Sequence, residues 1–402
     1  MSDPSFGFEP LSRAFRASPY AAYARLQRED PVHRSPLGMW VVTRWDDVAS
    51  VVKDPRFGMG GFWSRQSAML GPGPAERMGS ASFFFKDPPD HTRLRNLVSR
   101  AFTPRRIAAL GARIGAIVEA QLAPARESGR IDVIRDLAFP LPVLVIAEML
   151  GLPSEDRALF HAWTQAMNLS FEPVVSPEQA ALCHSAVGEL ESYLLGCVRA
   201  RRESPGEDLL TALIQVSDQG DRLSEPELVG TAALLLSAGY ETTMGLIGNG
   251  ALALVRHPEQ ARRLAQDPDA AANAVEEFMR YDSPVQFTAR EPLEPVELRG
   301  RKLMPGELCL AVVAAANRDP EHFDRPETLD VARANASDQV SFGGGRHFCL
   351  GAPLARLEGA IAFRALAPLL VGAEIASDRL EWRDSFLNHA LESLPLRLEP
   401  PR

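Results

Sequence analysis

One stretch of this sequence, residues 342–351, combines a single cysteine with a glycine-rich loop. It reads Phe-Gly-Gly-Gly-Arg-His-Phe-Cys-Leu-Gly, and Ala352-Pro353 directly after it predict a helix with proline near its start. Cys349 therefore lies at a helix N-terminus, where the helix dipole and unpaired N–H groups stabilise a thiolate over a thiol. The glycines permit close backbone approach to a flat ligand. The stretch suits a thiolate that binds a soft metal in a large planar group.

The spacing of Phe342, Gly345, Cys349 and Gly351 resembles the haem-binding loop of the cytochromes P450. That family ligates the iron of haem b (iron protoporphyrin IX) through a cysteine thiolate, which favours O–O cleavage. The resemblance implies that Cys349 is the axial metal ligand and that the other three residues form the cofactor-binding loop around it. From this loop alone, a buried structural cysteine or a nucleophilic pair of Cys349 with His347 stays open as an alternative.

A second candidate site lies in the longest predicted helix, residues 225–257, whose apolar part carries Glu241 as its only charge. Several glycines and an asparagine lower its hydropathy, so we expect a helix through the core rather than a membrane span. Ala238 and Gly239 leave room for a ligand, and Glu241 with Thr242 places an acid and an alcohol in the middle of the core. The run is similar to the P450 oxygen-binding helix, which implies that this pair delivers protons to dioxygen; a helix kink is the alternative.

Four further side chains could bind carboxylates. His91 and Arg95 are four residues apart on a predicted helix and so share a face, although a solvated helix face has the same pattern. Bacterial P450s of the macrolide-hydroxylase type carry a similar Pro-Pro-acid-His-x-x-x-Arg run, and the resemblance implies that both residues bind a haem propionate. It assigns the same role to Arg290 and His347.

Glu277 and Arg280 lie three residues apart on the predicted helix 270–281, where an acid and a base can pair. Such a spacing is weak by itself, but it resembles the P450 structural signature that holds the haem-side core together. The family often completes this pair with an arginine before the cysteine loop. Thr328 stands where many relatives have that arginine, so Arg325 and Arg333 are candidates for the third member.

The remaining pattern predicts a mainly α protein with a minor β region. Prolines divide the predicted helices between residues 104 and 220, and alternation around turns predicts a small sheet in residues 285–316. Residues 317–340 are expected to form an irregular meander.

Three segments are predicted near a ligand pocket. Residues 56–86 are glycine-rich yet strongly aromatic, which indicates either an apolar lid over a ligand or a loop packed on its own core. Residues 171–177 interrupt two helices and resemble the mobile roof of P450 pockets. Near the C-terminus, Phe386-Leu387-Asn388 predicts a hairpin that touches a substrate.

Composition sets broad bounds. The 402 residues are 46% hydrophobic, which allows an ample core, and they show no linker or repeat, so we expect a single domain over residues 1–402. A net charge of −9 argues against nucleic-acid binding. The start of the chain, Met1 to Phe6, lacks a basic and apolar leader, and the four scattered cysteines fit the reducing cytoplasm, so we expect neither a signal peptide nor a membrane anchor.

The resemblance covers nearly the whole chain and implies a monomeric bacterial cytochrome P450 fold. It implies a monooxygenase that inserts one oxygen atom of O2 into an apolar molecule of polyketide, terpenoid or fatty acid type. No flavin or iron–sulfur segment is evident, so electrons are expected from a ferredoxin and its NAD(P)H-dependent reductase. Two alternatives stay open: a peroxide-driven peroxygenase of the same fold, and a catalytically silent docking module.

Overall fold

A computed structural model describes residues 8–218 and 220–399 of the protein. The first residues of the chain, on which the expected lack of a signal peptide rests, lie outside this part. The chain divides into two compact units. The first comprises Met1–Phe57, Ala109–Pro142 and Glu241–Arg402, and the second comprises Gly58–Ala108 and Val143–Tyr240. The expected single domain over residues 1–402 stays a prediction.

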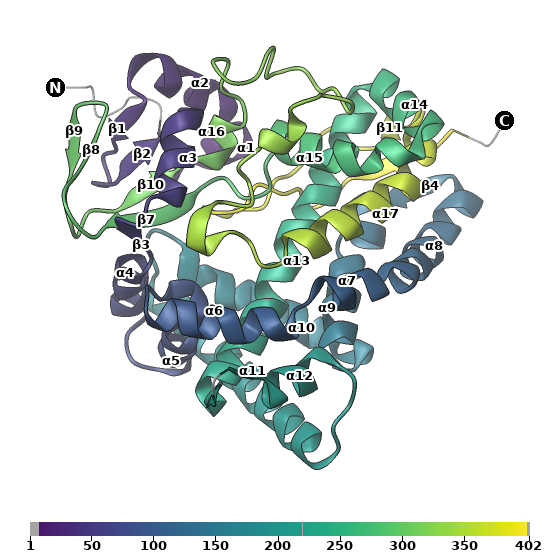
Figure 1. The fold of residues 1–402 in the computed structure, drawn as a ribbon. Helices are drawn as coiled ribbons and strands as arrows, with labels where there is room; N and C mark the ends of the chain where they lie inside the picture. Colours follow the sequence, from purple (N-terminus) through teal and green to yellow (C-terminus); the bar gives the residue numbers. More distant parts are fainter. Residues whose placement is uncertain (1–7, 219, 400–402) are drawn as a thin grey trace. The chain divides into compact units, whose positions relative to one another are not determined.

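The first unit contains the larger sheet, whose strand order is β1-β2-β10-β7-β3. Strands β1 and β2 are antiparallel, β2 and β10 are parallel, and β10 and β7 are antiparallel. Figure 1 shows these strands beside α2 and α3. Their apolar faces enclose a cluster that includes Val42, Val48, Phe57 and Ala311, as alternating β-branched and aromatic residues favour. The β strands of the first unit, with β3 at its border, are β1 Val32–Arg34, β2 Trp40–Val42, β3 Phe57–Gly58, β4 Arg130–Asp132, β7 Thr288–Pro292, β8 Val296–Leu298, β9 Arg301–Leu303, β10 Cys309–Ala311, β11 Glu374–Ile375 and β12 Pro395–Arg397.

Helices make up the rest of the first unit. The long α17 packs against α8, α14 and α15, and small residues allow this close approach, since a Cβ on Gly359 would lie 2.9 Å from the Val275 side chain. The helices of this unit are α1 Arg13–Ala17, α2 Tyr20–Glu29, α3 Trp45–Lys53, α8 Gly111–Ser128, α14 Pro258–Gln266, α15 Ala271–Tyr281, α16 Val313–Ala316 and α17 Ala352–Leu370, with shorter turns at η2 Ile134–Ala138, η5 Pro268–Ala270, η6 Ala336–Asp338 and η7 Gly345–His347.

The second unit is built mainly from helices, among which α11 packs against α5, α10 and α12. A capping box sets the start of α11: the Ser176 hydroxyl accepts a hydrogen bond from the Gln179 N–H, and the Gln179 side chain accepts one from the Ser176 N–H. Pro177 lies in the first turn of this helix. The elements of this unit are α4 Gly60–Leu70, α5 Pro74–Ala81, η1 Phe83–Phe85, α6 Asp90–Ala101, α7 Pro104–Ala109, η3 Ser154–Asp156, α10 Arg157–Asn168, η4 Leu169–Phe171, α11 Pro177–Glu203, α12 Leu209–Gln215, β5 Ser217–Asp218 and β6 Asp221–Arg222.

Two helices, α9 Pro140–Leu150 and α13 Glu225–Arg256, contribute residues to both units. In α13, glycines permit tight packing: a Cβ on Gly248 would lie 2.5 Å from Ile134, and one on Gly250 would lie 2.4 Å from Phe363. This buried core helix agrees with the interpretation of its apolar sequence. Within the described ranges, no single helix has the length and apolarity to cross a membrane; the pair Asp90–Ala109 and Gly111–Ser128, bent by 58°, meets those criteria only as a pair and by composition.

Candidate active site

The cysteine loop of the first unit is closed by a backbone hydrogen bond from the Cys349 N–H to the Phe342 carbonyl at 2.9 Å. Gly343 and Gly345 adopt φ angles of 68° and 60°, a region that residues with a Cβ rarely occupy. A Cβ on Gly345 would also lie 2.8 Å from the Val52 carbonyl oxygen. Glycine at position 345 is therefore required both by the turn and by the contact with α3.

This closure leaves Cys349 exposed just before α17. Gly351 is the residue before the first helical turn, and Pro353 lies within that turn, so the thiol faces the electropositive end of a long helix. Two other cysteines differ sharply, because burial raises the pKa of Cys183 to about 11 and that of Cys309 to about 12. Burial also raises the pKa of the half-buried Cys197. Among the four cysteines, Cys349 therefore has the surroundings that best suit a thiolate ligand.

Side chains beneath the loop hold it in place. The ring of Phe342 is buried, and the Arg356 guanidinium lies 4.5 Å from the ring centroid. Arg356 is ion-paired with Glu276 of α15, which also accepts a hydrogen bond of 2.9 Å from the Gln339 amide. Sequence reasoning missed Arg356 and Glu276, whose only sequence signal is their place in two predicted helices. They connect the loop to α15 through a stacked cation and an ion pair.

The predicted pair Glu277 and Arg280 lies fully buried in α15, with two parallel hydrogen bonds of 2.7 and 2.8 Å. Arg280 also donates to the carbonyls of the meander, including that of Thr328 at 3.1 Å. Arg333 is the third member, since its Nε lies 3.1 Å from Glu277 and its Nη2 donates to the Thr328 carbonyl at 2.9 Å. Arg325 is instead exposed. The structure thus decides between the two candidates that the sequence left open.

The middle of α13 is unusual for a core helix, because three of its residues are accessible. Ala238 is exposed, and Gly239 and Thr242 are half-buried, although the neighbouring residues of the helix are mostly buried. A Cβ on Gly239 would meet nothing closer than Ile146 at 3.9 Å. Ala238 and Thr242, four apart, share one face. This face can accept a ligand directly against the helix.

Glu241 is buried next to this face, with 8% of its surface exposed. Its carboxylate accepts a hydrogen bond of 2.9 Å from the Asn388 amide and one of 3.3 Å from the Arg383 guanidinium. Both donors belong to the segment near the C-terminus, which sequence reasoning placed near a substrate without connecting it to the acid.

In the first unit, Arg290 is buried on β7, where its Nη1 donates to the Thr288 hydroxyl at 2.7 Å and to the Ala289 carbonyl at 2.8 Å. These bonds fix the direction of the guanidinium. His347 lies half-buried in η7, two residues before Cys349. The same unit thus contains two of the four predicted propionate-binding residues and the cysteine.

The other two predicted propionate-binding residues, His91 and Arg95, lie on α6 of the second unit. His91 is buried and its ring lies 6.4 Å from that of Phe83, while the Arg95 guanidinium lies 5.9 Å from the same ring. The two side chains share a helix face as their spacing predicted.

Residues 56–86 are not the loop that their glycine content predicted. They form α4, α5 and η1, because the glycines and prolines lie at helix starts and close contacts: Pro74 opens α5, and a Cβ on Gly79 would collide with the Trp63 ring. The Trp63 ring stacks on that of Phe85 with centroids 4.4 Å apart. The aromatic residues therefore pack partly on one another.

These helices contact the segment predicted as a pocket roof. The Gln66 amide donates to the Glu172 carbonyl at 3.1 Å and also to the Ser170 carbonyl. The Phe171 ring lies 5.8 Å from that of Phe85. Two segments that the sequence analysis placed near a ligand pocket thus meet inside the second unit.

An exposed thiol at a helix N-terminus and an accessible face on α13 are features that suit a haem-thiolate protein. The comparisons with known proteins identify the family. The chain belongs to the cytochrome P450 family, whose members bind haem b and act as monooxygenases. The family's sequence model, described as "Cytochrome P450", matches residues 74–366.

Similar proteins cover nearly the full chain. Vitamin D(3) 25-hydroxylase of Pseudonocardia autotrophica is 42% identical over 97% of this chain and 96% of its own length. The polyketide biosynthesis cytochrome P450 PksS of Bacillus subtilis is 38% identical over 97% of this chain and 98% of its own. The crystal structure of CalO2 has a TM-score of 0.92 at 36% identity and covers 98% of this chain and 99% of its own. The predicted fold, mainly α with a minor β region, is confirmed.

Proposed function

We propose that this P450 inserts one oxygen atom of O2 into an apolar organic molecule, with Cys349 as the ligand of the haem iron. The observation that carries the proposal is the exposed thiol that ends a closed glycine loop at the start of α17. A thiolate there is stabilised by the helix dipole and by unpaired N–H groups. Bound haem would supply the iron that activates dioxygen.

Four cationic or cation-forming residues are assigned to the haem propionates. Arg290 is supported by its buried and fixed guanidinium, and His347 by its place beside the cysteine. His91 and Arg95 are supported by their shared face on α6 and by the resemblance of their run to other bacterial P450s. Charge-assisted hydrogen bonds from such donors suit carboxylates.

Glu241 and Thr242 are assigned to proton delivery. Each turnover of the proposed reaction takes up dioxygen, two electrons and two protons, and leaves one oxygen atom in the product and the other in water. An accessible alcohol next to a buried acid suits this proton supply. The same pair favours a monooxygenase over a peroxygenase, which obtains its oxygen and protons from hydrogen peroxide, and over a silent docking module.

We infer that the electrons come from a ferredoxin and its NAD(P)H-dependent reductase, because the bacterial P450s to which this chain is similar use ferredoxin-type partners. A monomeric state and a cytoplasmic location belong to the same proposal. The cysteines are few and scattered along the sequence, which supports the location because such a pattern fits a reducing compartment.

For the substrate we propose a fairly large apolar molecule of polyketide, terpenoid or fatty acid type. The accessible Ala238 and Gly239 and the aromatic residues of α4 and η1 offer apolar contacts. The names of two relatives, one for vitamin D(3) and one for polyketide biosynthesis, support this range.

The decisive experiment is the absorbance spectrum of the haem-loaded protein after reduction and binding of carbon monoxide. A red-shifted thiolate band is expected, and its absence would rule out the proposed ligand. A screen of polyketides, terpenoids and fatty acids for displacement of the iron-bound water would then identify the substrate class.

A further inference from the structure

The acid and the alcohol of α13, although adjacent in sequence, face different surroundings. Successive residues of an α-helix are about 100° apart around its axis. Thr242 lies with Ala238 on the accessible face. Glu241, Gly245 and Asn249 are spaced by four and so lie on another face. The carboxylate therefore does not share the direction of the hydroxyl that it is assigned to serve.

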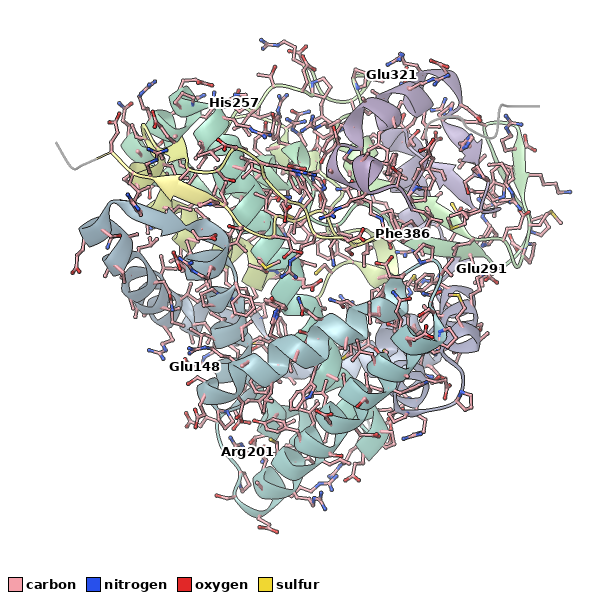
Figure 2. The ribbon with its side chains drawn as sticks, turned by 180° about the vertical axis from the view of Figure 1, so that it is seen from behind. Glu148, Arg201, His257, Glu291, Glu321 and Phe386 are labelled. Atoms are coloured by element: carbon pink, nitrogen blue, oxygen red, sulfur yellow. The ribbon has the colours of Figure 1, made fainter. Side chains whose placement is uncertain are left out.

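A hairpin formed by residues 382–391, here called the C-terminal hairpin, covers the Glu241 face. A Cβ on Gly245 would lie 3.6 Å from the Ala390 Cβ, and the Asn249 amide donates to the His389 carbonyl at 2.8 Å. The hairpin is closed by a bond of 2.9 Å from the Arg383 N–H to the Ala390 carbonyl. Phe386, which Figure 2 labels, belongs to it. The hairpin is thus attached directly to α13.

Two hairpin side chains reach Glu241. Asn388 donates to one carboxylate oxygen at 2.9 Å and Arg383 to the other at 3.3 Å. The Arg383 Nε also lies 3.7 Å from Glu392, whose side chain is 49% exposed. Arg383 therefore stands between a buried acid and an acid that contacts solvent, and it is itself only 14% exposed.

Asn388 also borders a small cavity, which is lined by the aromatic rings of Phe15, Phe287 and Phe386 and by the polar side chain of Gln286, among others. The Oδ1 atom of Asn388 is buried and has no hydrogen-bond partner among the described residues. Buried polar atoms of this kind are usually satisfied by ordered water. The cavity beside Asn388 has polar as well as aromatic lining residues, so it suits such a water.

We propose that Arg383 and Asn388 are positioning residues for proton delivery: they hold the Glu241 carboxylate against the C-terminal hairpin, where it can take up protons from the solvent side. This inference rests on the proposed role of Glu241. A proton gained by the carboxylate would be passed toward Thr242 and replaced from solvent, so no other reactant is required. Without the two donors, the carboxylate loses two hydrogen bonds that fix its direction, one of them from a cation.

The test uses the haem-loaded full chain with a surrogate ferredoxin and its reductase, and measures hydrogen peroxide released per NAD(P)H consumed. Incomplete proton delivery releases the reduced dioxygen as peroxide. Arg383→Met and Asn388→Ala should each raise this ratio at least about twofold. Arg383→Lys keeps the charge, so its ratio should stay close to that of the wild type. The matched control is Arg379→Met, a charge loss at an exposed residue close to the hairpin.

A second readout does not depend on turnover. Urea unfolding of Arg383→Met, Glu241→Gln and the double variant forms a double-mutant cycle. The unfolding equilibrium constant of the double variant should differ by about threefold or more from the value expected if the two single effects were additive, because the two residues are in contact. Arg379→Met should be additive with Glu241→Gln. Asn388→Ala, a milder change, gives the same comparison if Arg383→Met does not fold.

The outcomes separate this inference from the proposal on which it rests. If Glu241→Gln raises peroxide release while both hairpin variants leave it unchanged or act additively, the positioning role is wrong and the role of Glu241 stands. If Glu241→Gln itself has no effect, both are wrong. A spectrum without the thiolate band after carbon monoxide binding would instead contradict the haem ligand.

Discussion

At the scale of single residues, the environment of each ionisable group decides its chemistry. Cys183 and Cys309 are thiols in apolar surroundings, and burial raises the pKa of both. Cys349 is exposed at a helix N-terminus. The same residue type is therefore an inert core residue in two places and a suitable metal ligand in the third.

Replacing the proposed ligand tests this difference. Cys349→Ser exchanges a soft thiolate for a hard, poorly ionised alcohol, so we expect loss of the red-shifted carbon monoxide band and of oxygenation, even if haem stays bound. Cys197→Ser, at a half-buried cysteine, is the matched control and should keep both. Unchanged turnover and an unchanged spectrum in Cys349→Ser would exclude Cys349 as the ligand.

Glu358 of α17 is a buried acid outside the proposed mechanism, and its Oε2 has no hydrogen-bond partner among the described residues. Burial raises its pKa to about 8. In the unfolded chain this carboxyl ionises at lower pH, so between about pH 5 and pH 8 the folded state binds more protons and stability falls as pH rises.

Glu358→Gln should remove this decrease in stability with rising pH, because glutamine has no proton to lose. Relative to the wild type, the free energy of unfolding of the variant is expected to increase with pH by up to about 1.4 kcal/mol per pH unit in that window. Urea unfolding at several pH values measures it, with the exposed Glu327→Gln as control. A difference between variant and wild type that stays constant with pH would show that Glu358 does not hold its proton in the folded state.

At the scale of elements, α15 connects the meander and the cysteine loop. Through Glu277 and Arg280 it binds the meander, and through Glu276 it binds Arg356, whose guanidinium covers Phe342 of the loop. Buried ion pairs contribute through geometry more than through net energy, and removal of one partner leaves an uncompensated charge.

Arg333→Met should therefore destabilise the protein by about 1–3 kcal/mol, since Glu277 would lose one of its two cationic partners. The matched control is Arg325→Met, which should change the free energy of unfolding by less than about 0.5 kcal/mol because Arg325 is exposed. Urea unfolding compares the two. Equal effects at both positions would contradict the three-residue arrangement.

At the scale of the whole molecule, the net charge of −9 is reversed locally in α6 and α7. The arginines of these two helices differ in exposure, and Arg93 and Arg106 are only half-exposed. Arg93 pairs with Asp221 and Glu227, and Arg106 donates to a backbone carbonyl. Arg100 and Arg105 are exposed, and we propose that they guide an acidic ferredoxin.

Arg100→Glu and Arg105→Glu should each slow reduction by ferredoxin several-fold at low salt, with a smaller effect at high salt, where exposed charges are screened. Turnover driven by hydrogen peroxide should hardly change. Stopped-flow reduction across a range of salt measures the effect, with the exposed Arg157→Glu of α10 as control. Equal rates for all variants would place the docking surface elsewhere.

The sequence alone determined the features that depend on local pattern. The glycine spacing around Cys349, the apolar run of α13 and the spacing of Glu277 and Arg280 predicted a loop, a core helix and a buried pair, and the structure has all three. Each depends on residues within a few positions of one another, so short-range geometry specifies it.

Tertiary structure decided the features that join distant segments. It selected Arg333 over Arg325 as the partner of Glu277, brought Arg383 and Asn388 to Glu241, and folded residues 56–86 into helices. Arg333 lies 56 positions from Glu277 in the chain, and Arg383 and Asn388 lie 142 and 147 positions from Glu241. No local periodicity encodes such contacts, because they arise only when packing places separate segments side by side and their polar groups must find partners.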